Sequence, residues 1–163
     1  MASGKSKVAE QLAAAMGFTF FDIDKSITDI ENRTVTEIFL ESGEEYFRII
    51  EMKVLHETAN LKNAVIATGG GLPSHSDNMI WMNNHGITVY LEANKGLLFH
   101  RLMQNRGERP LLQGLSDIEL MEKISSHLAE RISFYTKAKI IFPASSVNLK
   151  QLIGKIKEID QST

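Results

Sequence analysis

The sequence predicts a three-layer α/β/α fold, in which helices cover both faces of a parallel sheet. Short apolar and β-branched runs, each suited to a buried strand, alternate along the chain with longer segments of helical periodicity. Polar and glycine residues follow two of these runs, at the strand ends where such sheets bind ligands. The 163 residues are expected to form a single domain, 1–163, large enough to bury a core without disulfides.

The first two elements bring acidic residues to a strand end. A helix is expected over 5–16, ended by Gly17, and a buried strand follows at 18–23. At the end of this strand, Asp22 and Asp24 can both reach one cleft, one toward a metal and one toward a substrate hydroxyl. Capping of the following segment by either carboxylate is the alternative.

The rest of the chain continues the alternation. A Ser or Thr with Glu three residues later, the capping-box pattern, marks helix starts at Thr34 and Ser116. Three glycines directly follow the strand at 64–68, which indicates that a ligand approaches the backbone closely there. Further helices are expected at 34–42, 43–60, 74–84, 94–104, 116–136 and 148–159, and further strands at 64–68, 87–91 and 139–142.

Composition excludes several classes of function. The absence of cysteine rules out thiolate zinc sites and cysteine nucleophiles, and a net charge of −2 gives no electrostatic case for binding nucleic acid or an anionic membrane. No apolar run approaches membrane-spanning length, and the N-terminus lacks a signal-peptide pattern. We therefore expect a soluble, cytoplasmic and monomeric protein.

The first six residues, Met-Ala-Ser-Gly-Lys-Ser, match the end of the phosphate-binding motif G-x-x-x-x-G-K-[ST]. In that motif Gly4 turns backbone N–H groups inward, Lys5 reaches the β- and γ-phosphates, and Ser6 offers its hydroxyl to Mg²⁺. The first glycine of the motif would lie two residues before Met1. Because Gly-Lys-Ser alone is a weak signal, a chance tripeptide in a flexible terminus is the alternative.

Six motifs in order along the chain resemble shikimate kinase. They are Gly-Lys-Ser at 4–6, Phe-Asp-Ile-Asp at 21–24, Phe47-Arg48, Gly-Gly-Gly at 69–71, Arg-Pro-Leu-Leu at 109–112, and Arg131 with Tyr135. The resemblance spans nearly the whole chain and implies a P-loop kinase of sheet order 2-3-1-4-5. It also implies transfer of the γ-phosphate of ATP to the 3-hydroxyl of shikimate, with Mg²⁺, in aromatic amino-acid biosynthesis.

The resemblance further implies roles for individual residues. The implied catalytic residues are Lys5, Asp24 and Arg109, and the implied metal ligands are Ser6 and Asp22. Shikimate would be bound by Asp24, Phe39, Phe47, Arg48, Gly69, Gly70, Gly71 and Arg131, mainly from helices at about 25–60. ATP would be bound by Ala2, Ser3, Gly4, Lys5, Ser6, Lys7, Arg101, Arg109 and Asn148, with a mobile lid at about 105–114.

Alternatives remain for the roles of Arg48 and Arg131 and for the function of the whole protein. Arg48 lies among Glu44, Glu45 and Glu51 and could simply pair with them at helical spacing, and Arg131 could be a surface charge. At the level of function, the rivals are a gluconate or nucleoside monophosphate kinase of the same fold and an inactive, truncated relative. The arginine pair, which suits a carboxylate better than a base, argues against the first rival.

The resemblance also implies a missing strand. The first strand of the family's sheet would lie before Met1, so strands 64–68 and 87–91 should flank an empty position. At a spacing of roughly 9–10 Å they would be too far apart to hydrogen-bond. Each backbone group left unpaired in the core costs about 1–3 kcal/mol, so the 163-residue chain should be unstable or inactive unless that position is filled.

Overall fold

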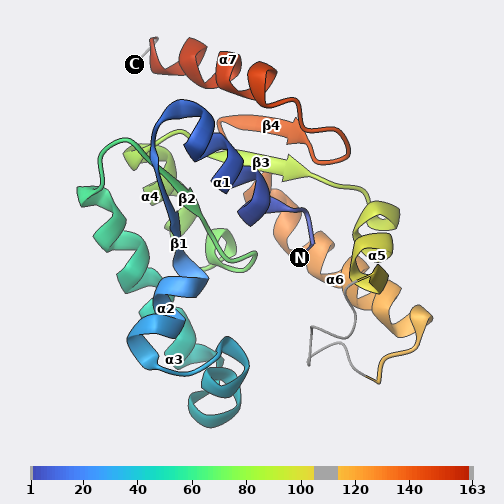
Figure 1. The fold of residues 1–163 in the computed structure, drawn as a ribbon. Coiled ribbons are helices and arrows are strands. Elements are labelled where there is room, and N and C mark those ends of the chain that lie inside the picture. The colour runs from blue at the N-terminus through green and yellow to red at the C-terminus, as the bar shows by residue number, and fades with distance from the viewer. Residues whose placement is uncertain (1, 105–113, 162–163) are drawn as a thin grey trace.

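The computed structural model describes residues 2–104 and 114–161, which form one mixed arrangement of helices and parallel strands (Figure 1). The strands are β1 (Thr19–Asp22), β2 (Ala64–Ala67), β3 (Val89–Glu92) and β4 (Ile140–Pro143). The α-helices are α1 (Lys5–Met16), α2 (Ile23–Glu31), α3 (Val35–Glu57), α4 (Asn78–His85), α5 (Lys95–Gln104), α6 (Asp117–Tyr135) and α7 (Leu149–Asp160). Two short 3₁₀ helices, η1 (Thr58–Asn60) and η2 (Leu72–Ser74), follow α3 and the glycine run.

The four strands form two separate parallel pairs within the described ranges. β1 pairs with β2, with Thr19 opposite Ala64, and β3 pairs with β4, with Val89 opposite Ile140. No ladder joins β2 to β3 in this part of the chain. The two pairs are thus the outer strands of the expected sheet, and the strands predicted to flank the empty position are indeed not hydrogen-bonded to each other.

A cavity of about 820 Å³ lies between the two strand pairs. Its apolar walls come from α1, β2, β3 and α6, and they include Leu12, Val65, Leu91 and Ile124. At one end the cavity reaches the phosphate-loop lysine and the glycine run. A strand laid in this space would face the unpaired backbone edges of both β2 and β3.

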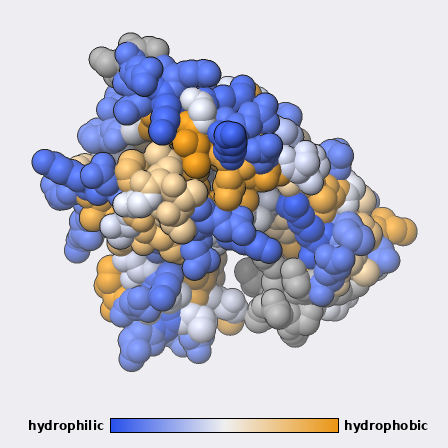
Figure 2. Space-filling view, turned by 45° about the horizontal axis from the view of Figure 1, so that its top comes forward, coloured by the Kyte–Doolittle hydropathy of each residue, from blue (hydrophilic) through white to orange (hydrophobic). Residues whose placement is uncertain are grey.

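Two hydrophobic clusters hold the helices against the strands. The larger joins α1, β3, β4, α5, α6 and α7, and it includes the fully buried Leu102, Leu120, Phe142 and Leu152. The smaller joins α2, α3 and η2 around Ile27 and Ile38. The second cluster forms the lobe of α2 and α3 at the bottom of Figure 1. Figure 2 shows a hollow beside this lobe on the lower part of the molecule.

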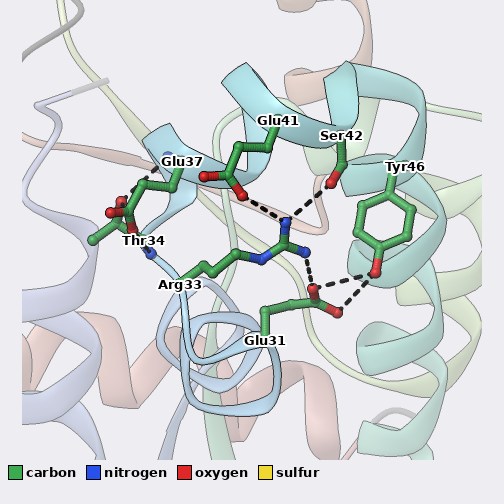
Figure 3. A network of polar contacts seen from close by, with 7 residues as sticks. All are labelled: Glu31, Arg33, Thr34, Glu37, Glu41, Ser42 and Tyr46. Carbon is green, nitrogen blue, oxygen red and sulfur yellow. Dashed lines mark hydrogen bonds and ion pairs between the residues drawn. The ribbon is translucent and has the colours of Figure 1, made fainter.

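The turn from α2 to α3 is fastened by a polar network around one arginine (Figure 3). Arg33 contacts Glu31, Glu41 (3.1 Å) and Ser42 (3.1 Å), and the Tyr46 hydroxyl donates to Glu31 as well. The capping box predicted at Thr34 is present, with its side chain accepting from the backbone of Glu37. The network therefore fixes the entry to α3 at the outer end of the lobe.

Most predicted elements are confirmed, and the differences have local causes. Helix α1 has the predicted bounds, and the second capping box forms at Ser116. The predicted break at Gly43 is a kink within α3, where φ is 83°. The predicted strand end at Ile23 and Asp24 is instead the first turn of α2, because Asp22 caps that helix by accepting from Lys25 N at 3.2 Å. None of the described helices is long and apolar enough to cross a membrane.

We predict that an added strand stabilises this chain. Extending it before Met1 with about 5–6 apolar β-branched residues and then Gly-Xaa should raise the melting temperature and the affinity for ATP, because the edges of β2 and β3 gain partners and the phosphate-binding motif gains its first glycine. Thermal unfolding and ATP titration measure both effects. A Gly/Ser extension of equal length is the control, and equal melting temperatures for the two extensions would contradict the prediction.

Candidate active site

The phosphate loop leads directly into α1. Gly4 has φ of 86°, a left-handed conformation that favours glycine, and its carbonyl accepts the first helical hydrogen bond, from Val8 N at 3.0 Å. The first turn of α1 contains no acidic side chain. Its free N–H groups and the positive end of the helix dipole therefore favour an anion at the position where the sequence predicts phosphate.

The predicted metal ligands, Ser6 and Asp22, lie side by side. The Ser6 hydroxyl donates to Asp22 Oδ2 at 3.0 Å, while Oδ1 of the same carboxylate caps α2. A hydroxyl and a carboxylate oxygen are donors that suit Mg²⁺, which keeps several waters and substrate oxygens in kinase sites. The described residues contain no cluster of three or more acidic, histidine or cysteine ligands. This pair therefore fits Mg²⁺ that is coordinated partly by a nucleotide, rather than Mg²⁺ that is coordinated by protein ligands alone.

Asp24 occupies the first turn of α2, close to the phosphate-loop lysine. Burial raises the pKa of the Asp24 carboxyl above its usual 3.8; Lys5 and Arg48 oppose this shift, and Asp22 adds to it. The lysine and the carboxylate are thus electrostatic neighbours although they come from different helices. A buried carboxylate with a raised pKa is a stronger proton acceptor than one in water.

Arg48 on α3 is held by two acidic neighbours on the same helix. Nη1 donates to Glu51 Oε2 at 2.6 Å, and Nη2 donates to Glu44 Oε1 at 2.8 Å. The pairing that the sequence left open as an alternative is therefore present. Glu51 is only 1% exposed while Glu44 is 59% exposed, so the two partners differ in how readily a ligand can replace them.

The aromatic residues predicted to contact substrate lie against the Arg48 guanidinium. The rings of Phe39 and Phe47 are 4.7 Å apart between centroids, and Arg48 Cζ lies 5.9 Å and 5.4 Å from them, respectively. Phe47 is buried in the smaller hydrophobic cluster, and Phe39 is half-buried at its edge. The two rings pack beside the arginine side chain.

The glycine run after β2 lies close to the side chains of Asp24, Arg48 and Glu51. A Cβ on Gly69 would lie 2.5 Å from Glu51 Oε1 and 2.9 Å from Asp24 Oδ1. A Cβ on Gly71 would lie 2.5 Å from Arg48 Nη2. Side chains at these positions would displace the carboxylates and the arginine. The close approach in the structure is made by the chain's own side chains, and the approach of a ligand to this backbone stays a prediction.

Arg131 and Tyr135 reach the same glycine run from α6. The Tyr135 hydroxyl donates to Gly70 O at 2.5 Å, and Arg131, one helical turn earlier, lies close enough to oppose the rise that burial causes in the pKa of the same phenol. Arg131 also acts electrostatically on the Glu44 and Glu51 carboxyls, which places it near Arg48. The two predicted arginines therefore converge from α3 and α6.

Two predicted nucleotide-binding residues have structural contacts that sequence reasoning missed. Arg101 donates to the carbonyls of Ala2 (3.3 Å), Ser3 (2.7 Å) and Ala144 (2.8 Å), which ties the phosphate loop to the segment after β4. Asn148 caps α7 by accepting from Gln151 N at 3.1 Å. Lys7 is exposed on α1, and Arg109 with most of the predicted lid lies outside the described residues.

The sequence predicted no site role for Glu51, which it offered only as a possible partner of Arg48, or for Tyr135, which it offered only as part of a family motif. The sequence contained a signal for Glu51, since it lies three residues after Arg48 on a helix, the spacing of a side-chain pair. It contained no comparable signal for the Tyr135 hydroxyl, because its partner Gly70 is 65 residues away.

The phosphate loop at a helix N-terminus, beside the carboxyl ends of parallel strands, defines the class of this protein as a P-loop kinase. The family model described as shikimate kinase matches residues 1–160. A shikimate kinase of Phocaeicola vulgatus is 42% identical over 153 residues, covering 94% of this chain and 87% of its own. The chain therefore belongs to the shikimate kinase family, and it is an ATP-dependent transferase that works with Mg²⁺.

Solved structures agree with this assignment. The crystal structure of shikimate kinase from Bacteroides thetaiotaomicron matches with a TM-score of 0.87 at 39% identity, covering 99% of this chain and 92% of that one. Shikimate kinase from Acinetobacter baumannii, solved in complex with shikimate, matches with a TM-score of 0.84 at 31% identity, covering 99% and 89%. The α/β P-loop fold predicted from the sequence is thereby confirmed.

The contact between Gly71 and Arg48 generates a testable prediction. Gly71→Ala should weaken shikimate binding about 10- to 100-fold, because the new methyl group displaces the guanidinium from its position. Calorimetric titration with shikimate measures the change. Gly154→Ala in α7, where a Cβ meets nothing within 4 Å, is the matched control and should leave binding unchanged. Equal affinity of the Gly71→Ala variant and the unsubstituted chain would show that Arg48 does not need its present position.

Proposed function

We propose that this chain transfers the γ-phosphate of ATP to the 3-hydroxyl of shikimate. The observation that carries the proposal is the convergence of Lys5 and Asp24, the first at the predicted phosphate site and the second beside the glycine run. A phosphate donor and a hydroxyl acceptor bound on these two sides would meet between the lysine and the carboxylate. The family assignment and the shikimate complex of the A. baumannii relative support the choice of acceptor.

Asp24 would orient the attacking hydroxyl and accept its proton. As the bond from the hydroxyl oxygen to the γ-phosphorus forms and the bond to the β-phosphate oxygen breaks, the proton passes to the Asp24 carboxylate. Lys5 would neutralise the charge that spreads over the phosphoryl oxygens. When bound, Mg²⁺ supplies further charge neutralisation, and Ser6 with Asp22 are the residues that would hold it.

Arg48 and Arg131 would bind the shikimate carboxylate, since a guanidinium fork matches a carboxylate geometrically. Glu44 contacts two nitrogens of the Arg48 fork. Because Glu44 is exposed, the substrate carboxylate can take its place while the buried Glu51 keeps hold of Nη1. Phe39 and Phe47 would flank the ring, and backbone N–H groups of Gly70 and Gly71 would face its substituents.

The remaining roles rest on the family resemblance. Arg109 would close over the phosphates with the lid, and Arg101 and Asn148 would border the nucleotide. Arg101 would act in part through the phosphate-loop carbonyls that it holds. We also propose that the protein acts as a monomer in the cytoplasm.

The proposed reaction is tested by ADP release in a coupled assay, and here and below the chain is extended at its N-terminus by the apolar strand and Gly-Xaa described above. Shikimate should support ADP formation, whereas gluconate and nucleoside monophosphates should not, because they do not combine a carboxylate with a ring of matching shape. Turnover with gluconate or a monophosphate but not with shikimate would assign the chain to one of the rival kinases. If ATP and shikimate bind without ADP release, the chain is a non-catalytic relative.

The Asp24 carboxyl generates a second prediction for this reaction. Asp24→Asn should lower kcat by about 10²- to 10⁴-fold, because the variant cannot accept a proton. In the unsubstituted chain, activity should fall on acidification at a pH above that of an ordinary aspartate, because burial raises the pKa of this group. Steady-state rates across pH measure both effects. An acid limb at the pKa of an exposed aspartate would exclude Asp24 as the base.

The same variant should be more stable. A carboxyl whose pKa is raised in the folded state destabilises that state when ionised, so the penalty is present at neutral pH and disappears on acidification. Asp24→Asn should therefore raise the melting temperature at pH 7, with a smaller gain at lower pH. Asp29→Asn, on the exposed face of α2, is the matched control and should change neither rate nor melting temperature.

A further inference from the structure

The Tyr135 hydroxyl lies where three parts of the acceptor site meet. It donates to Gly70 O at 2.5 Å, and the Arg131 guanidinium, on the preceding turn of α6, lies close enough to act on it electrostatically. Tyr135 is the last residue of α6, and Gly70 belongs to the run that follows β2. One hydroxyl group thus connects the helix that carries Arg131 with the backbone that carries Gly71.

The hydrogen bond to Gly70 O determines which way the next N–H points. The described backbone contains no cis peptide bond, so the C=O and N–H of the Gly70–Gly71 peptide lie on opposite sides of its plane. Holding the carbonyl toward Tyr135 directs the Gly71 N–H away from it. The Arg48 guanidinium fills the space that a Cβ on Gly71 would occupy, at the distance given above, so the tyrosine and the arginine contact neighbouring parts of this glycine run.

The tyrosine ring is itself held in place. Tyr90 of β3 stacks on it, with ring centroids 5.0 Å apart and planes inclined by 29°. Burial raises the pKa of the Tyr135 phenol above its usual 10.0, although Arg131 opposes the shift. The hydroxyl is therefore protonated at neutral pH and remains a hydrogen-bond donor to the Gly70 carbonyl.

We propose that Tyr135 is a positioning residue for the acceptor site, whose hydroxyl aligns the Gly70–Gly71 peptide and the Arg131 guanidinium toward the carboxylate and ring substituents of an acidic alicyclic substrate. The inference rests on the proposed function, and it adds a residue that does not itself touch the substrate. Its effect is specific to the acceptor, because Arg131 and Gly71 belong to the acceptor side while Lys5 and Ser6 hold the nucleotide.

Tyr135→Phe tests the inference by removing only the hydroxyl. We expect the dissociation constant of shikimate to rise about three- to tenfold, the usual effect of losing one hydrogen bond, while that of ATP changes less than twofold. Tyr90→Phe is the matched control, since it alters the stacked partner ring in the same way and should leave both constants unchanged. Calorimetric titration of the two variants and the unsubstituted chain gives all six values.

A second readout needs no substrate. In ¹H–¹⁵N spectra of the ligand-free chain, Tyr135→Phe should shift the Gly71 amide signal, and Tyr90→Phe should leave it in place. An unchanged Gly71 signal, or an equal loss of ATP and shikimate affinity, would overturn the positioning role. Absence of shikimate binding by the unsubstituted chain would instead overturn the proposed function, and the amide signal would still decide whether Tyr135 aligns the peptide.

Discussion

The site depends on the parallel register of β1 with β2. In this register Asp22 lies opposite Ala67, and both strands end at the same edge. The next residues along each strand are therefore neighbours, which brings Asp24 to within 2.9 Å of the Cβ position of Gly69. A slip of one residue would point these side chains to the opposite face. The pairing of β1 with β2 therefore positions the predicted metal ligand Asp22, the proposed base Asp24 and the glycine run.

The charged groups at that edge stabilise one another only in part. Glu51 is buried with one oxygen on Arg48, and its Oε1 has no hydrogen-bond partner among the described residues. Burial raises the pKa of the Glu51 carboxyl, although Arg48 opposes the shift. Such a cluster costs folding free energy, because each buried charge loses its hydration. The concentration of these groups at one strand end is therefore typical of a binding site rather than of a structural core.

Sequence periodicity predicted the helices and strands well because each depends on local properties. Apolar spacing located α1 and α6, and the capping boxes at Thr34 and Ser116 are interactions within three residues. The beginning of α2 was predicted as a strand end, since the run of 18–24 contains aromatic and β-branched residues on both sides of Asp22. The hydrogen bond from Lys25 N to the Asp22 side chain caps α2, and residues 23 and 24 are therefore helical. Apolar periodicity does not reveal this competition between strand and helix.

The sequence by itself determined the class of the fold, the phosphate loop and the residue types of the acceptor site, because motif order and local propensity are properties of the chain. Only the tertiary structure decided how these residues are used. It paired Arg48 with Glu44 and Glu51, tied Arg101 to the phosphate loop, and joined Tyr135 to Gly70 across 65 residues. The Arg101 and Tyr135 contacts join segments distant in sequence, which no local pattern encodes. The Arg48 pairs are local in sequence, and what the tertiary structure decided there is that Glu51 is buried while Glu44 is exposed.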